Sequence, residues 1–307
     1  MNNEKEELPI LIVNEKNSPP PNITTYTKLK KINKSSQKKK DIKKIILIVL
    51  LIINILIFLV MGIKTYKWYK DNKEIEQELK DINKLIKNKN TKSSEGQINS
   101  NKESNNKIQD DYFDLRKESI NNIDFSKILS MNNDTKGWIE VNGTDINYPF
   151  VQTDNNDYYL THSFSKKENS AGWIFIDYRN DINNLSKNTI IYGHGRLNNT
   201  MFGSLKKIVK NPWLSNKDNF YVKTATSTDT SLWQVFSTYT IEPESYYITT
   251  KFNDSEYSEF IKKIKNRSVY NFNVELNNND KILTLSSCYD NSKRVVLHSK
   301  LIQTITK

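Results

Sequence analysis

The sequence is poor in the residues that build covalent and metal cross-links, with one cysteine and three histidines in 307 residues. A lone cysteine cannot form a disulfide within the chain and cannot by itself build a structural metal site. No two of the histidines, His162, His194 and His298, are spaced like metal ligands on one helical turn. We therefore expect no metal and no other cofactor. Cys288 is then either a buried packing residue or a reactive thiol.

The sequence also lacks a recognisable nucleic-acid-binding pattern, although its formal net charge is +11. Residues 1–44 hold 11 lysines against 5 acidic residues, which leaves only +5 for the rest of the chain. We find no helix-turn-helix, zinc-finger or RNA-binding signature, and so expect no nucleic-acid partner. The length and the 36% content of apolar residues allow one well-buried domain plus appended segments.

One long apolar run stands out. Residues 45–63 read IILIVLLIINILIFLVMGI, and only Asn54 among them is strongly polar. This length spans a bilayer core, and the run lacks both the polar face of a core helix and the cleavage site of a signal peptide. Nine lysines lie between Lys28 and Lys44, whereas the charges after the run are mixed. The positive-inside rule predicts a single-pass protein of the cell membrane with a cytoplasmic N-terminus and an extracellular remainder.

The segment after the membrane run has two parts of different composition. Ile75, Leu79, Ile82 and Ile86 form one apolar stripe at helical spacing, typical of a stalk helix or of a solvated helix that dimerises weakly, so the oligomeric state stays open. Residues 87–110 are polar and predict a tether. We therefore divide the chain into a basic cytoplasmic tail (1–44), a transmembrane helix (45–63), an extracellular stalk and linker (64–110) and a folded domain (111–307).

The folded domain is dominated by short runs rich in β-branched and aromatic residues, which are typical of strands. The runs are GWIEV, INYPFVQ, YYLTH, GWIFID, NTIIYGH, FYVKTA, LWQVFSTYTI, KILTLSSC and RVVLHSKLI. Helical spacing appears at 112–120, 125–129, 201–209 and 255–265. The fold class we predict is a mainly β, closed barrel with peripheral helices.

Three chemically useful side chains fall at ends of these runs. Cys288 ends KILTLSSC, His194 ends NTIIYGH, and Arg294 begins RVVLHSKLI. A thiol becomes a nucleophile when a base or a cation lies nearby, and strand ends can meet at one rim of a barrel. The residues alone leave a second interpretation open, because lone cysteines are most often buried packing residues.

Several segments resemble the sortase family. TLSSC at 284–288 resembles the TLxTC nucleophile strand, most closely the TLSTC form of class B, and the following RVV resembles the strand of the catalytic arginine, here Arg294. IIYGHGRLNNTMFGSLKKI at 190–208 resembles the class B segment that carries the histidine, here His194. Further matches in the same order are found at 132–160 and 172–180. Departures are Ser287 in place of threonine, Gly195 in place of asparagine, and only five residues between Cys288 and Arg294.

The resemblance implies a closed sortase-type barrel and a cysteine transpeptidase, a thiol enzyme of EC 3.4.22 type. It implies that Cys288 attacks an NPxTx-like sorting signal of a secreted protein after its threonine, and that a peptidoglycan-precursor amine, such as that of lipid II, accepts the acyl group. It further implies His194 as acid and base, Arg294 as the cation for the oxyanion, and Tyr192 and Ser286 as residues of the substrate groove.

Other functions remain open at this point. The domain could be a non-enzymatic, membrane-tethered module that binds cell walls, or a cysteine protease that hydrolyses instead of transferring. A pilin-polymerising class C sortase fits less well, because such enzymes usually carry a second apolar helix, which the residues up to Lys307 do not contain. We expect no catalytic role for His162 or His298.

Overall fold

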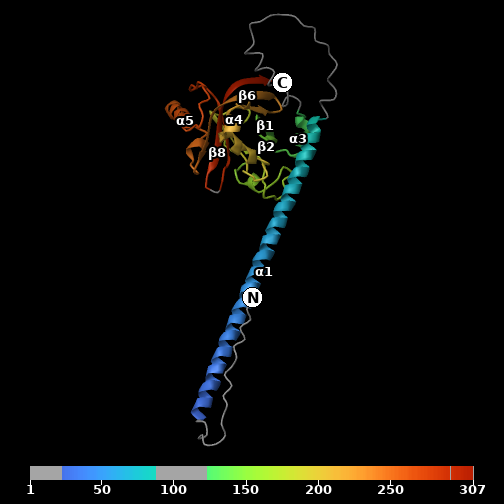
Figure 1. Ribbon diagram of the computed structural model, residues 1–307. Helices are drawn as coiled ribbons and strands as arrows, with labels where there is room; N and C mark the ends of the chain where they lie inside the picture. The colour runs from blue at the N-terminus through green and yellow to red at the C-terminus, as the bar shows by residue number, and fades with distance from the viewer. Residues whose placement is uncertain (1–22, 88–122, 291, 307) are drawn as a thin grey trace, which may run out of the picture. The chain divides into compact units, whose positions relative to one another are not determined.

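Eight β-strands close into a barrel in the order β1-β2-β3-β4-β7-β8-β6-β5 (Figure 1). The computed structural model describes residues 23–87, 123–290 and 292–306. The strands are β1 (Thr135–Val141), β2 (Asn147–Val151), β3 (Phe175–Ile176), β4 (Asn188–Tyr192), β5 (Tyr221–Ala225), β6 (Asp229–Ile241), β7 (Ile282–Cys288) and β8 (Arg294–Thr306). The prediction of a closed, mainly β barrel is confirmed.

Most neighbouring strands in the barrel are antiparallel. The exceptions are β2 with β3 and β4 with β7, which run parallel. In the β4–β7 pair the two strands run side by side from Asn188 opposite Ile282 to Tyr192 opposite Ser286. The carboxyl ends of β4 and β7 therefore lie next to each other at the same end of the barrel.

Eight of the nine predicted runs form strands, and YYLTH does not. Tyr158–Leu160 form a 3-10 helix, η2. The Asn155 side-chain oxygen accepts hydrogen bonds from the backbone N–H groups of Asp157 and Tyr158, at 2.9 Å each, and this turn starts the helix. Tyr159 is buried, so the aromatic run reports burial and not strand conformation.

Short helices surround the barrel. They are α3 (Phe125–Met131), η3 (Gly203–Val209), α4 (Asn211–Leu214), η4 (Lys217–Asn219), η5 (Tyr246–Ile248) and α5 (Asp254–Asn266). Helical structure is thus confirmed at the predicted positions near 125, 201 and 255, whereas the predicted helix at 112–120 lies outside the described residues. Helix α5 begins with a capping box formed by Asn253 and Glu256, and its apolar face, which includes Tyr257 and Ile264, is buried.

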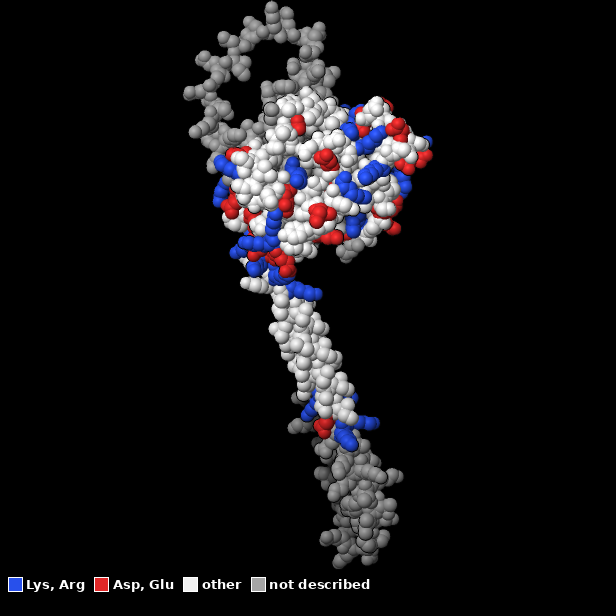
Figure 2. Space-filling model, turned by 180° about the vertical axis from the view of Figure 1, so that it is seen from behind, with Lys and Arg blue, Asp and Glu red and all other residues white. Residues whose placement is uncertain are grey.

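Helix α1 (Ile23–Lys87) contains the predicted membrane run. By length and composition it can cross a membrane, and the apolar residues from Ile45 to Ile63 are exposed. Figure 2 shows this stretch of the helix as an uncharged surface with basic side chains at both ends. The helix is compatible with a membrane anchor. Its sidedness stays a prediction from the lysine distribution.

The chain divides into two units, residues 1–66 and 67–307, so the end of α1 belongs to the barrel unit. Ile75 and Ile82 are 1% and 0% exposed and are part of the hydrophobic core, and Leu79 packs against it. The predicted stalk and linker at 64–110 stay a prediction, and residues 88–110 of that range lie outside the described residues. An apolar stripe on a helix shows that one face is buried but does not show which surface covers it.

His298 lies in the barrel interior within a directed chain of hydrogen bonds. Thr284 donates to the Asn188 side-chain oxygen at 2.6 Å, so Thr284 accepts from His298 Nδ1 at 2.8 Å. Nε2 then accepts from the Tyr239 hydroxyl at 2.8 Å, and Tyr239 accepts from Tyr246. The ring is therefore neutral with its proton on Nδ1. Burial lowers the pKa of His298 to about 3.

This pKa predicts a pH-dependent stability. The unfolded chain binds a proton at His298 below its ordinary pKa of 6.5, whereas the folded protein does not bind one until about pH 3. The free energy of unfolding should therefore fall as the pH falls through this window, by about 1.4 kcal/mol per pH unit from this group. We expect urea midpoints in detergent solution to decrease from pH 7 to pH 4.5, and less steeply in His298→Gln. Parallel curves for both proteins would contradict the assignment.

Candidate active site

Cys288, His194 and Arg294 lie at the ends of three neighbouring strands. Cys288 is the last residue of β7, and Arg294, the first of β8, is its cross-strand partner. His194 follows the end of β4 by two residues, as Cys288 follows Ser286, the partner of Tyr192. The two segments stay in contact beyond the paired region, since the Cys288 carbonyl oxygen lies against Gly195. The structure thus brings together the three residues singled out in the sequence.

Cys288 is not sealed in the barrel interior. Cys288 is a free cysteine and is half-buried, and so is Arg294. Side chains at directly opposed positions of an antiparallel pair project to the same face, with Cβ atoms about 4.5–5.5 Å apart. The Arg294 guanidinium can therefore approach a group that is bound at the Cys288 sulfur. A sealed, purely structural cysteine would instead be surrounded by core side chains.

The His194 ring is fixed by a backbone carbonyl. Nε2 lies 2.8 Å from the Leu160 oxygen, and a carbonyl can only accept, so Nε2 is the donor. In the neutral ring Nδ1 is then unprotonated and can take up a proton. Gly172, at φ +59°, packs beside the ring, and a Cβ there would lie 2.9 Å from His194 Cδ2. Sequence reasoning missed Leu160 and Gly172, because main-chain contacts leave no side-chain pattern.

Tyr192 and Ser286 are cross-strand partners at the same end of the barrel. The Tyr192 hydroxyl donates to Asp177 Oδ2 at 2.9 Å, and Arg179 binds the same carboxylate through Nε at 2.8 Å and Nη2 at 2.7 Å. Burial alone would raise the pKa of Asp177, but these hydrogen bonds outweigh it and hold the pKa below its usual value. Burial, together with the Asp177 charge, raises the pKa of Tyr192, so the phenol stays a neutral donor.

Tyr247, in η5, is a further residue of this region that the sequence did not reveal. Its hydroxyl lies 3.2 Å from Ser286 Oγ, and the residue is buried. Burial raises the pKa of Tyr247, and the hydrogen bond with Ser286 and the charge of Arg294 only partly offset this effect. Asn188 Nδ2 donates to the carbonyls of Tyr247 and Thr249 at 3.1 and 2.9 Å, which fixes this segment.

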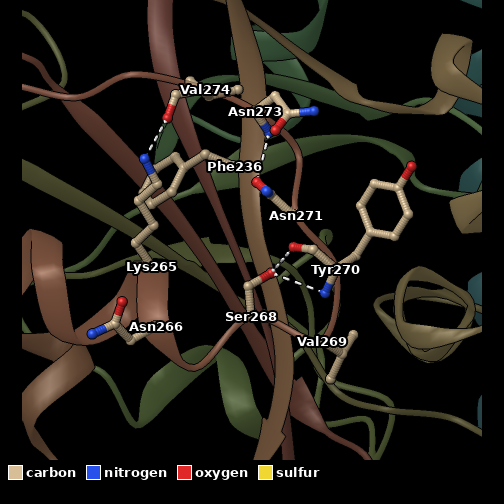
Figure 3. A pocket seen from close by; sticks show the side chains of 9 residues that line it. All are labelled: Phe236, Lys265, Asn266, Ser268, Val269, Tyr270, Asn271, Asn273 and Val274. Carbon is tan, nitrogen blue, oxygen red and sulfur yellow. Dashed lines mark hydrogen bonds between the residues drawn. The ribbon is translucent and has the colours of Figure 1, made fainter.

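Cavities lie on the described part of the barrel unit. One, of about 690 Å³, adjoins η5 and is lined by Tyr178, Arg179, Ser245, Ile248, Thr249, Thr250 and Lys251. The other, of about 300 Å³, lies between β6 and the segment after α5, and its nine lining residues are labelled in Figure 3. None of the predicted site residues lines either of these cavities. Two residues that line the second cavity are hydrogen-bonded to each other, Lys265 Nζ to the Val274 oxygen at 2.9 Å.

The closed barrel carries a half-buried cysteine at the end of β7, a histidine just beyond β4 and an arginine at the start of β8, the arrangement expected of a sortase-type barrel. The comparisons with known proteins agree. A sequence model described as a sortase domain matches residues 139–302. Sortase B of Listeria monocytogenes is 35% identical over 205 residues, which cover 64% of this chain and 76% of that protein.

Sortase B of Staphylococcus aureus is 37% identical over 189 residues, covering 58% of this chain and 75% of that protein. The solved Staphylococcus aureus sortase B–substrate complex superposes with a TM-score of 0.58 at 31% identity, covering 74% of this chain and 97% of that one. The chain therefore belongs to the sortase family, and its relatives are class B sortases. Sortases are cell-wall transpeptidases.

Gly195 gives a first test of the site. A Cβ at this position would lie 2.0 Å from the Cys288 carbonyl oxygen, so Gly195→Ala must push the histidine and cysteine segments apart. We expect a loss of about 100-fold in the cleavage rate of a sorting-signal peptide, because displacements near 1 Å have effects of that size. Gly62→Ala is the control, since nothing lies within 4 Å of that position. Equal rates in both variants would argue against close apposition of the two segments.

Proposed function

We propose that this protein cleaves a C-terminal sorting signal of the NPxTx type after its threonine and transfers the acyl group to an amine of a peptidoglycan precursor. The observation that carries the proposal is the meeting of Cys288, His194 and Arg294 at adjoining strand ends. The reaction anchors secreted proteins that bear the signal to the cell wall.

The first half of the reaction forms a thioester. The Cys288 thiol gives its proton to His194 Nδ1, and the thiolate attacks the threonine carbonyl carbon. The resulting tetrahedral oxyanion is stabilised by the Arg294 guanidinium. The C–N bond then breaks, His194 gives its proton to the leaving amine, and the C–S bond remains. His194 suits this role because Leu160 holds Nε2 and leaves Nδ1 for proton exchange.

The second half reverses these steps with a new amine. The incoming amino group attacks the thioester carbon while His194 accepts one of its protons, and collapse of the intermediate forms an amide and releases the thiolate. Tyr192 and Ser286 line the approach to Cys288 on the β4–β7 side. In this proposal they act mainly through the groups they hold, the buried Asp177 and Tyr247.

The membrane arrangement follows from the same proposal. Residues 45–63 span the membrane, the basic tail 1–44 is cytoplasmic, and the catalytic barrel lies outside, where both secreted proteins and lipid-linked wall precursors are available. The lysine-rich flank before Ile45 and the uncharged surface of α1 in Figure 2 support this orientation.

Cys288→Ala is the central test. We expect at least a 1000-fold loss of signal-peptide cleavage, on the order seen when a catalytic nucleophile is removed, with the fold retained. The measurements are the fluorescence of a quenched NPxTx peptide and the circular dichroism of the purified protein. Full activity of this variant would end the proposal.

Product analysis separates transfer from hydrolysis. With wild-type protein and a glycine or diaminopimelate-type amine, we expect the new amide to be the major product by mass spectrometry, because the amine captures the thioester before water does. Free threonine carboxylate as the only product at saturating amine would identify a hydrolytic cysteine protease. Binding to cell walls without any cleavage would identify a non-enzymatic module.

A further inference from the structure

The end of α1 makes polar contacts with the barrel along one face. Lys67, Asp71, Glu74 and Glu78 recur at helical spacing on this face. Lys67 Nζ pairs with Glu168 at 3.1 Å, the Asp71 carboxylate accepts from the backbone N–H of Ser170 at 3.0 Å and from its hydroxyl, and Glu78 accepts from the backbone N–H of Phe164 at 3.1 Å. Side chains of the helix therefore hold the loop 163–170 through both backbone and side-chain groups of the loop.

The loop 163–170 is hydrogen-bonded to the segments that contact the His194 ring. Asn169, which is fully buried, donates from Nδ2 to the Asp71 carbonyl at 3.1 Å and from its backbone N–H to the Thr161 carbonyl at 2.8 Å. Its own carbonyl accepts from Gly172 N–H at 3.0 Å. Asn169 thus connects α1 to Gly172, which packs against the His194 ring, and to the residue after Leu160.

A second connection runs through Arg196. Arg196 Nη2 and Asn198 Nδ2 both donate to the Asn72 side-chain oxygen. Burial lowers the pKa of Arg196, and the charge of Asp71 acts against that decrease. Among the described residues Arg196 Nε has no hydrogen-bond partner. The groups that compensate this desolvated guanidinium are therefore on α1.

Arg196 is two residues from His194, and Gly195 between them lies against the Cys288 carbonyl. Holding the Arg196 side chain through Asn72 therefore fixes the backbone that carries the imidazole next to the thiol. If Asn72 is lost, a half-buried cation loses its hydrogen-bond acceptor, and the segment 194–198 is free to shift towards solvent.

We propose that Asn72 is a positioning residue for the transpeptidation reaction. Through Asn72 and Asp71, the end of helix α1 holds His194 and its hydrogen-bond acceptor, the Leu160 carbonyl, at the positions they need beside Cys288. The proposal rests on the proposed function and adds that the active site is incomplete without residues 67–82. The barrel alone does not supply these contacts.

The test uses the full chain in detergent and the variants Asn72→Ala, Asn72→Asp and Asn83→Ala. Asn83 is exposed on the same helix and serves as the matched control. For Asn72→Ala we expect kcat to fall about tenfold with KM within about twofold, since proton transfer is misaligned and peptide binding is retained. Asn72→Asp should keep at least half of kcat, because its carboxylate accepts from the same donors. Asn83→Ala should match wild type.

Hydrogen–deuterium exchange gives a readout that needs no substrate. The Phe202 N–H donates to the His194 carbonyl at 3.0 Å, so peptides covering 194–203 should exchange faster in Asn72→Ala than in Asn83→Ala. Adding Arg196→Ala to Asn72→Ala should lower kcat no further than Arg196→Ala alone, because both changes break one connection.

Several outcomes would overturn the inference while leaving the proposed function standing. The first is an active wild type with the same kcat in Asn72→Ala and Asn83→Ala. The second is a double variant, Asn72→Ala with Arg196→Ala, whose losses of kcat add. The third is an equal loss of kcat in Asn72→Ala and Asn72→Asp, accompanied by a matching decrease in Tm. An inactive wild type would instead refute the proposed function, and unchanged exchange in 194–203 would independently refute the positioning role of Asn72.

Discussion

Parallel pairing of β4 with β7 is the constraint on which the site depends. Because the strands run in the same direction, their carboxyl ends lie side by side, and the residue two positions beyond each pair is His194 on one strand and Cys288 on the other. The antiparallel turn into β8 returns Arg294 to the level of Cys288. A slip of one residue in either pairing would turn the side chains to the opposite face and separate the three groups.

Backbone groups fix the positions of several of these side chains. The Leu160 carbonyl fixes the tautomer of His194, and Gly172 and Gly195 permit approaches that a Cβ would block. Buried side chains in turn hold backbone: Asn188 binds the carbonyls of the η5 segment, which brings Tyr247 next to Ser286. Such a site needs few special residue types, because its accuracy comes from satisfied polar groups in a packed barrel.

Helix α1 meets two different surroundings along its length. From Ile45 to Ile63 it is apolar all round, as suits lipid, and after Lys67 it carries a single stripe of apolar and acidic residues that faces protein. The physical difference is visible in the composition, since a helix surrounded by hydrocarbon has no polar face and a helix on a domain surface has one.

The sequence by itself determined the local structure and the identity of the reactive groups: strands where β-branched and aromatic residues cluster, helices near 125, 201 and 255, an apolar run able to cross a membrane, and Cys288, His194 and Arg294 at run ends. Only the tertiary structure decided how distant residues pair. In the structure YYLTH contains a 3-10 helix and not a strand. Tyr192 is hydrogen-bonded to Asp177 and Tyr247 to Ser286. Ile75 and Ile82 are buried against the barrel. Periodicity and composition record whether a residue is buried, but the partner that buries it is chosen by contacts between segments far apart in the chain.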